Sequence, residues 1–199
     1  RKESSAASDV YKRQGVYFAG QVNGTSGYEE AAGQGFIAGA NAALSILGKE
    51  PLIIDRSESY IGVMVEDLVS NTRDEPYRLF TARSENRLSI REDNTVLRMA
   101  KYRTLLGLSN EVDTYNDKFV GGFDDYKNFL SECFVSASSS CLKGVDVKVP
   151  RRTSLADIIR QSNEKGIDNL KTIFKNLNIE IPHRLLKTIA ISVKYDGYI

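Results

Sequence analysis

The feature that most constrains this chain is a short apolar run followed directly by a loop rich in glycine. Residues 15–19 read Gly-Val-Tyr-Phe-Ala, which predicts a short buried strand that ends at Gly20. The following loop, residues 20–27, contains Gly20, Gly24 and Gly27. Because glycine allows positive φ and close approach of the backbone to a ligand, this loop is a candidate for ligand contact.

A helix rich in small residues is expected directly after this loop. Ser26 stands three residues before Glu29, which is the spacing of a capping box. The helix should begin near Gly27, run towards Leu47 and end at Gly48. Its many alanines and glycines would let it pack close to a sheet or a flat ligand.

The start of this helix is a candidate site for an anion. A helix N-terminus presents unpaired N–H groups and a partial positive charge. Neither G-x-G-x-x-G nor G-x-x-x-x-G-K-[ST] occurs in the loop, so the glycines alone are a weak signal. An ordinary, tightly packed βα turn explains them about as well.

Composition excludes several classes of protein. The chain has 199 residues, enough for one ordinary domain or two small ones, with 27 Lys plus Arg against 26 Asp plus Glu. A uniformly basic tail, a membrane bundle and a wholly disordered chain are therefore disfavoured. Two cysteines, Cys133 and Cys141, are too few for a disulfide scaffold. They favour a reducing compartment, although the sequence also allows one disulfide between these two cysteines.

The two ends of the chain do not resemble the ends of a natural domain. Residues 1–14 are polar and aperiodic, and Asp-Val-Tyr-Lys-Arg-Gln at 9–14 looks like a translated transposon adapter from library sequencing. A natural flexible terminus is the alternative. Ile199 follows without a polar tail, so the chain is expected to be an internal fragment.

The most basic stretch lies between Glu75 and Arg103. It contains six arginines and one lysine: Arg78, Arg83, Arg87, Arg91, Arg98, Lys101 and Arg103. Arginine pairs with phosphate and interleaved aromatics stack on unpaired bases, so a structured RNA is one interpretation. The other is a solvated helical stripe, because Arg83, Arg87 and Arg91 recur every four residues.

The last ninety residues predict helices. Aromatic residues at helical spacing cover 113–130, although Gly121 and Gly122 should interrupt them. Thr153 can cap a second helix, 167–177 forms an apolar stripe, and Pro182 suits the first turn of another helix. A zinc site at Cys133 and Cys141 is disfavoured, because the only histidine, His183, is distant in sequence and suits a surface or capping role.

Residues 19–35, Ala-Gly-Gln-Val-Asn-Gly-Thr-Ser-Gly-Tyr-Glu-Glu-Ala-Ala-Gly-Gln-Gly, resemble the glucose-inhibited division protein A family. The similarity continues through 60–69, 75–83 and 87–98, and it returns in Lys-Tyr-Asp-Gly-Tyr-Ile at the end. Good matching covers about residues 15 to 108. The family consists of FAD-dependent tRNA uridine 5-carboxymethylaminomethyl modification enzymes.

The resemblance implies a fold class and a cofactor. Residues 15–58 would be the strand, loop and helix that end a glutathione-reductase-like FAD domain, an α/β fold, and a mainly α-helical C-terminal region would follow. The implied FAD contacts are Gly20, Gln21, Gly24, Thr25, Ser26, Gly27 and Tyr28. The amides from Thr25 to Tyr28 would face the flavin ring, where negative charge develops on reduction. The NADH site would lie upstream of this chain.

The resemblance also implies a substrate and partners. Arg83, Arg87, Arg91 and Arg98 fall on matching positions and would contact tRNA or shape the entrance to the active site. With a GTPase partner, the enzyme would add a (carboxymethyl)aminomethyl group to C5 of the wobble uridine. The resemblance implies a homodimer in the cytoplasm, or in mitochondria for an organelle homologue. We expect no membrane span, no metal site and no catalytic residue in this chain.

The expected divisions are therefore 1–14 as a non-native or disordered segment, 15–58 as the end of the FAD domain, 59–110 as the arginine-rich segment and 111–199 as an incomplete helical domain. The chain alone would be inactive. A tRNA-binding or protein-docking module without chemistry, and the tail of a generic FAD oxidoreductase, are the alternatives.

Overall fold

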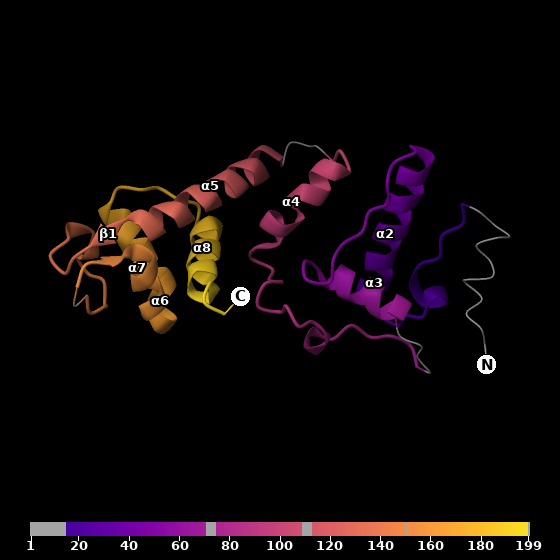
Figure 1. Ribbon diagram of the computed structural model, residues 1–199, viewed down its shortest axis with the longest axis horizontal. Coiled ribbons are helices and arrows are strands. Elements are labelled where there is room, and N and C mark those ends of the chain that lie inside the picture. Colours follow the sequence, from indigo (N-terminus) through magenta and orange to yellow (C-terminus); the bar gives the residue numbers. More distant parts are fainter. Residues whose placement is uncertain (1–14, 71–74, 109–112, 150, 199) are drawn as a thin grey trace. The chain divides into compact units, whose positions relative to one another are not determined.

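The computed structural model describes residues 15–70, 75–108, 113–149 and 151–198. They belong to two compact units that divide between Ile90 and Arg91 (Figure 1). This division lies inside the segment 59–110 that the sequence sets apart. The predicted adapter segment, residues 1–14, lies outside the described residues.

The first unit consists of two helices with short 3-10 turns and extended loops. Its elements are η1 (Gly20–Asn23), α2 (Tyr28–Ile46), α3 (Tyr60–Ser70) and η2 (Thr81–Arg83). The expected helix after the glycine loop is confirmed almost to the residue. It ends as predicted, because Gly48 has a φ of +63° directly after the last turn.

The strand expected at residues 15–19 is wrong. These residues are irregular, and Val16, Tyr17 and Phe18 are 52%, 45% and 57% exposed. A strand is held by hydrogen bonds to a neighbour, and the described part of this unit offers none to this segment. A short run of apolar and aromatic residues alone therefore did not produce a strand.

Helices α2 and α3 pack against each other through small residues (Figure 1). A Cβ added at Gly33 would come within 3.2 Å of Met64 Cε, so α3 uses the space that glycine leaves on α2. One added at Gly62 would overlap the backbone carbonyls of Ile54 and Asp55. Val63 and Met64 of α3 are buried.

The second unit is a helical domain, as the sequence predicts. Its helices are α4 (Thr95–Leu105), α5 (Asp113–Glu132), α6 (Leu155–Gln161), α7 (Gly166–Asn176) and α8 (His183–Tyr195), with 3-10 turns η3 (Ser140–Leu142) and η4 (Asn163–Lys165). A two-residue antiparallel pair joins β1 (Phe134–Val135) to β2 (Thr153–Ser154). Aliphatic and aromatic side chains from α5 to α8 form its core, including Leu130, Leu155, Ile158, Leu170, Ile173, Phe174, Ile189 and Val193.

Two local predictions in this unit are wrong for reasons of packing. Helix α5 runs through Gly121 and Gly122 without a break. A Cβ at Gly122 would lie 3.2 Å from Leu185 Cδ2, so this glycine makes room for α8. The cap of α6 is Ser154, not Thr153, because the Ser154 hydroxyl accepts the Asp157 N–H.

Candidate functional site

The loop before α2 turns sharply through two glycines. Gly20 and Gly24 have φ values of +81° and +88°, a region that side-chain-bearing residues rarely adopt. The Gly24 N–H donates to the Gln21 carbonyl at 3.1 Å and closes the turn between them. The sequence therefore places glycine where the backbone needs it.

A buried glutamine on α2 holds this loop in place. Gln34 is 5% exposed. Its Oε1 accepts the Gly20 N–H at 2.9 Å and the Asn23 Nδ2–H at 3.1 Å. Its Nε2 donates to Thr25 Oγ1 at 3.0 Å. One side chain thus fixes the loop at three points.

A distant segment joins the loop from the other side. Tyr77 is 1% exposed, and its backbone forms a parallel bridge with Thr25. The Tyr77 N–H donates to the Gly24 carbonyl at 2.7 Å, and the Tyr77 carbonyl accepts the Ser26 N–H at 3.2 Å. The start of the arginine-rich stretch is therefore anchored to the glycine loop.

Gly27 is the N-cap of helix α2, and unpaired amides follow it in the first turn. The first helical bond runs from the Ala31 N–H to the Gly27 carbonyl at 3.1 Å. Within the described part of the chain, the N–H groups of Tyr28 and Glu29 have no hydrogen-bond partner. Such groups attract negative charge.

The expected capping box between Ser26 and Glu29 is wrong. The cap lies one residue later, at Gly27, and the Ser26 hydroxyl donates to the Tyr77 carbonyl at 3.4 Å. The third helical residue is consequently Glu30, whose side chain points inward and is 4% exposed. Its Oε1 accepts the Leu79 N–H at 2.9 Å. This bond, followed by the residue's own N–H, lowers the pKa of Glu30 against the opposing effect of burial.

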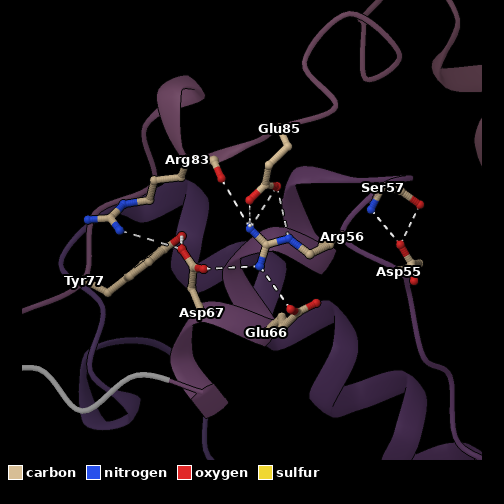
Figure 2. A network of polar contacts seen from close by, with 8 residues as sticks. All are labelled: Asp55, Arg56, Ser57, Glu66, Asp67, Tyr77, Arg83 and Glu85. Atoms are coloured by element: carbon tan, nitrogen blue, oxygen red, sulfur yellow. Dashed lines mark hydrogen bonds and ion pairs between the residues drawn. The ribbon is translucent and has the colours of Figure 1, made fainter. Parts of the chain in front are cut away.

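Figure 2 shows a polar network that continues from Tyr77. The Tyr77 hydroxyl donates to Asp67 Oδ2 at 3.1 Å. Asp67 is 7% exposed and also faces Arg83 and Arg56, at 3.8 and 3.6 Å. Arg83 lies over the ring of Tyr77, with 5.2 Å between Cζ and the ring centre. This network ties the segment after Tyr77 to α3.

Arg56 is the second cation of the network in Figure 2. It donates to Glu85 at 2.9 and 3.0 Å, to Glu66 at 3.1 Å and to the Arg83 carbonyl at 3.4 Å. The hydrogen bonds that Arg56 donates to Glu85 and Glu66 raise the pKa of Arg56. Three polypeptide segments of the first unit therefore meet at this guanidinium.

The four arginines predicted to contact tRNA have different surroundings. Arg83 and Arg87 belong to the first unit, and Arg91 and Arg98 belong to the second. Arg83 is held by Asp67 and by the Arg78 carbonyl, which accepts its Nε–H at 3.2 Å. Arg87 is exposed and has no hydrogen bond, ion pair or ring contact among the described residues. The helical-stripe interpretation is wrong, because residues 84–91 contain no helix and residues 85–89 form turns.

Arg91 and Arg98 organise the start of α4. Arg91 pairs with Asp93 at 2.9 Å and donates to Ser192 Oγ at 3.0 Å, and its side chain is 14% exposed. Arg98 donates to Asn94 Oδ1 and to the Arg91 carbonyl, both at 2.8 Å. Their geometry stabilises the second unit, and a role in tRNA contact stays a prediction.

The remaining candidate groups are isolated. Cys133 and Cys141 are free thiols, and burial, helped by Cys133, raises the pKa of Cys141. His183 is exposed at the first residue of α8, in keeping with its expected surface role. Among the described residues, no three or more His, Cys, Asp or Glu side chains are placed to hold a metal. None of the helices described there has the length and apolar content that crossing a membrane requires.

Four residues that position the site were not expected from the sequence: Glu30, Gln34, Arg56 and Asp67. Glu30 and Gln34 are four residues apart and share the inward face of α2. Two polar residues four positions apart, on a helix face made otherwise of small residues, could have indicated their positioning role from the sequence. Arg56 and Asp67 acquire their roles only from the fold, since their partners lie 10 to 29 residues away.

Comparison with known proteins identifies the family that this chain matches. The family model of glucose inhibited division protein A matches residues 6–50. The solved structure of Aquifex aeolicus GidA, in its form II crystal, superposes with a TM-score of 0.74 and 40% identity, covering 90% of this chain and 28% of that one.

Curated relatives agree with this match. The chain is 59% identical over 187 residues to the tRNA uridine 5-carboxymethylaminomethyl modification enzyme MnmG of Protochlamydia amoebophila, covering 93% of this chain and 28% of the relative. It is 38% identical over 196 residues to the MnmG of Helicobacter pylori, covering 96% of this chain and 31% of the relative. The chain thus belongs to the glucose inhibited division protein A family, and it spans less than a third of these relatives' length.

Proposed function

We propose that this chain is the flavin-facing part of an FAD-dependent enzyme that modifies the wobble uridine of tRNA. With a GTPase partner, the whole enzyme would add a (carboxymethyl)aminomethyl group to C5 of that uridine. The observation that carries the proposal is the pair of unpaired amides, Tyr28 and Glu29, at the start of α2 behind a loop clamped by Gln34. The names of the curated relatives support the tRNA uridine as substrate.

The residues present fit a flavin. A Cβ at Gly27 would overlap the Glu30 carboxylate, so glycine at this position lets that carboxylate lie against the start of α2. The Thr25 side chain is held by Gln34, and the Tyr28 side chain is 94% exposed and leaves the amides accessible. These residues, with Gly20, Gln21, Gly24 and Ser26, would hold the pyrimidine edge of the ring. When bound, FAD supplies a two-electron carrier between NADH and the one-carbon unit that is transferred.

The arginine-rich segment would bring the tRNA to the flavin. Tyr77 anchors the start of this segment to the glycine loop, and the Asp67 network positions Arg83. Arg87 has the exposed guanidinium that pairing with a phosphate requires. We assign the first contact with tRNA phosphate to Arg87, and a supporting role to Arg83, Arg91 and Arg98.

The assembly is part of the same proposal. The enzyme would be a cytoplasmic homodimer that takes NADH at a site outside this chain, and the second unit would dock the GTPase. The isolated chain would be inactive and would not retain FAD, because its amides contact one edge of the ring only. A stable yellow complex of the isolated chain with one equivalent of FAD would contradict that expectation.

The test compares two glycines of α2 in the full-length protein. Gly27→Ala places a methyl group against Glu30 and should lower FAD affinity at least tenfold. Gly35→Ala is the matched control, because no atom lies within 4 Å of its added Cβ. Bound FAD is measured by absorbance and the modified uridine by mass spectrometry of tRNA nucleosides. Equal FAD binding by both variants, or an unmodified wobble uridine with the unsubstituted protein, would refute the proposal.

A further inference from the structure

The Glu30 carboxylate lies against the first turn of α2, and one of its two oxygens has no partner among the described residues. Its Oε1 accepts the Leu79 N–H, but its Oε2 is buried and has no partner in the described part of the chain. A Cβ added at Gly27 would overlap Oε2, so this oxygen is aimed at the N-terminal end of the helix.

This carboxylate is negatively charged at neutral pH. The Leu79 N–H at 2.9 Å and the Arg78 Nε at 3.9 Å both favour the ionised form. The Arg78 side chain is 58% exposed, so water weakens its compensation of the buried charge. A buried negative charge therefore lies in the same helical turn as the unpaired amides of Tyr28 and Glu29.

The two features act on a bound flavin with opposite sign. When bound, FAD would take a hydride from NADH, so that NAD⁺ would leave and the reduced flavin would carry one additional negative charge. The free amides and the helix dipole stabilise that charge. The Glu30 carboxylate repels it, and burial makes the repulsion stronger than it would be in water.

We propose that Glu30 is a positioning residue that tunes the flavin: it holds Leu79 to the start of α2, and its charge makes flavin reduction less favourable than the helix alone would. This inference rests on the proposed function, because it takes the first turn of α2 as the flavin contact. It gives the buried carboxylate a role that a packing residue would not have.

The experiment measures the flavin midpoint potential of the full-length, FAD-loaded protein by titration against a reference dye. Glu30→Gln should raise the ratio of reduced to oxidised flavin about tenfold at a fixed potential, which equals ~30 mV for a two-electron couple. Glu30→Asp keeps the charge and should stay within about twofold of the unsubstituted protein. Glu29→Gln is the matched control, because Glu29 is in the same turn but exposed, and its small effect should vanish in high salt.

Arg78→Gln tests the same charge without disturbing a buried side chain. The ratio of reduced to oxidised flavin should fall about twofold, because the carboxylate loses its nearest cation. This variant decides the matter if Glu30→Gln does not load with FAD.

The outcomes separate this inference from the proposed function. An unchanged or lowered ratio in Glu30→Gln, an equal rise in Glu30→Asp, or an unchanged or raised ratio in Arg78→Gln would overturn the tuning role while FAD remains bound. Absence of FAD from the unsubstituted protein would refute the proposed function, and the inference with it.

Discussion

The bond between Tyr77, which is bridged to the glycine loop, and Asp67 should be the strongest single link between that loop and α3. Tyr77 is 1% and Asp67 7% exposed, and their oxygens are 3.1 Å apart. A hydrogen bond to a charged group contributes about 1.5–3 kcal/mol, and a buried hydroxyl left without a partner costs about 1–3 kcal/mol. Asp67→Ala leaves the buried Tyr77 hydroxyl without this partner, so it should reduce the local stability of this region by about 1–3 kcal/mol.

A double-mutant cycle isolates the bond from the rest of the network. Asp67→Ala, Tyr77→Phe and the double variant are compared, and the coupling energy should be about 1.5–3 kcal/mol. The readout is hydrogen exchange of the amide at position 77, a backbone group that donates to the Gly24 carbonyl and that neither substitution removes. This local measurement avoids the assumption that the two units unfold as one.

The matched control is Glu66→Ala, one residue earlier on α3. Glu66 also pairs with Arg56, but its side chain is 51% exposed, so water and salt screen the pair. It should leave exchange at position 77 nearly unchanged. A coupling energy below about 0.5 kcal/mol, or an equal effect of Glu66→Ala, would refute the assignment of Asp67 as the anchor.

Three further predictions follow from the same geometry. Gln34→Leu removes all three bonds to the glycine loop and should weaken FAD binding at least tenfold in the full-length protein, measured by fluorescence titration; an unchanged affinity would contradict the clamp. Because the pKa of Glu30 is lowered on folding, its contribution to stability is present above pH 4.5, the ordinary value, and is lost as pH falls through the lowered pKa. In Glu30→Gln, protection of the Leu79 amide from hydrogen exchange should therefore fall less as the pH is lowered than it does in the unsubstituted protein. The same fall in both proteins would exclude this. Arg87→Ala should weaken tRNA binding and reduce by about one the slope of the logarithm of the binding constant against the logarithm of the salt concentration. Arg91→Ala should instead lower the thermal stability of the second unit. The reverse pattern in binding and melting assays would contradict both predictions.

The helices could be predicted because their signals are local. Helix α2 starts and ends where the loop glycines and Gly48 indicate, and the apolar stripes of α7 and α8 face the core of their unit. Capping was less predictable. Ser26 and Thr153 each stand one residue before the true cap, because the direction of the entering chain decides which residue reaches the free N–H groups.

Predictions that needed a distant partner were the ones that failed. Residues 15–19 have the composition of a strand but no neighbouring strand among the described residues. Gly121 and Gly122 have the composition of a helix break, but the contact with Leu185 on α8 favours a continuous helix. Propensity is a weak prior that tertiary contacts override.

The sequence by itself determined the helical segments, the glycine loop and the family, since these depend on residue types at short spacings. Only the tertiary structure decided which polar groups are buried and with whom they pair. Arg83, Arg87 and Arg91 look equivalent in sequence, yet Arg83 and Arg91 are held internally and Arg87 faces solvent. The reason is that the cost of burying a charge depends on partners from distant segments, such as Asp67 and Ser192, which the fold alone brings near.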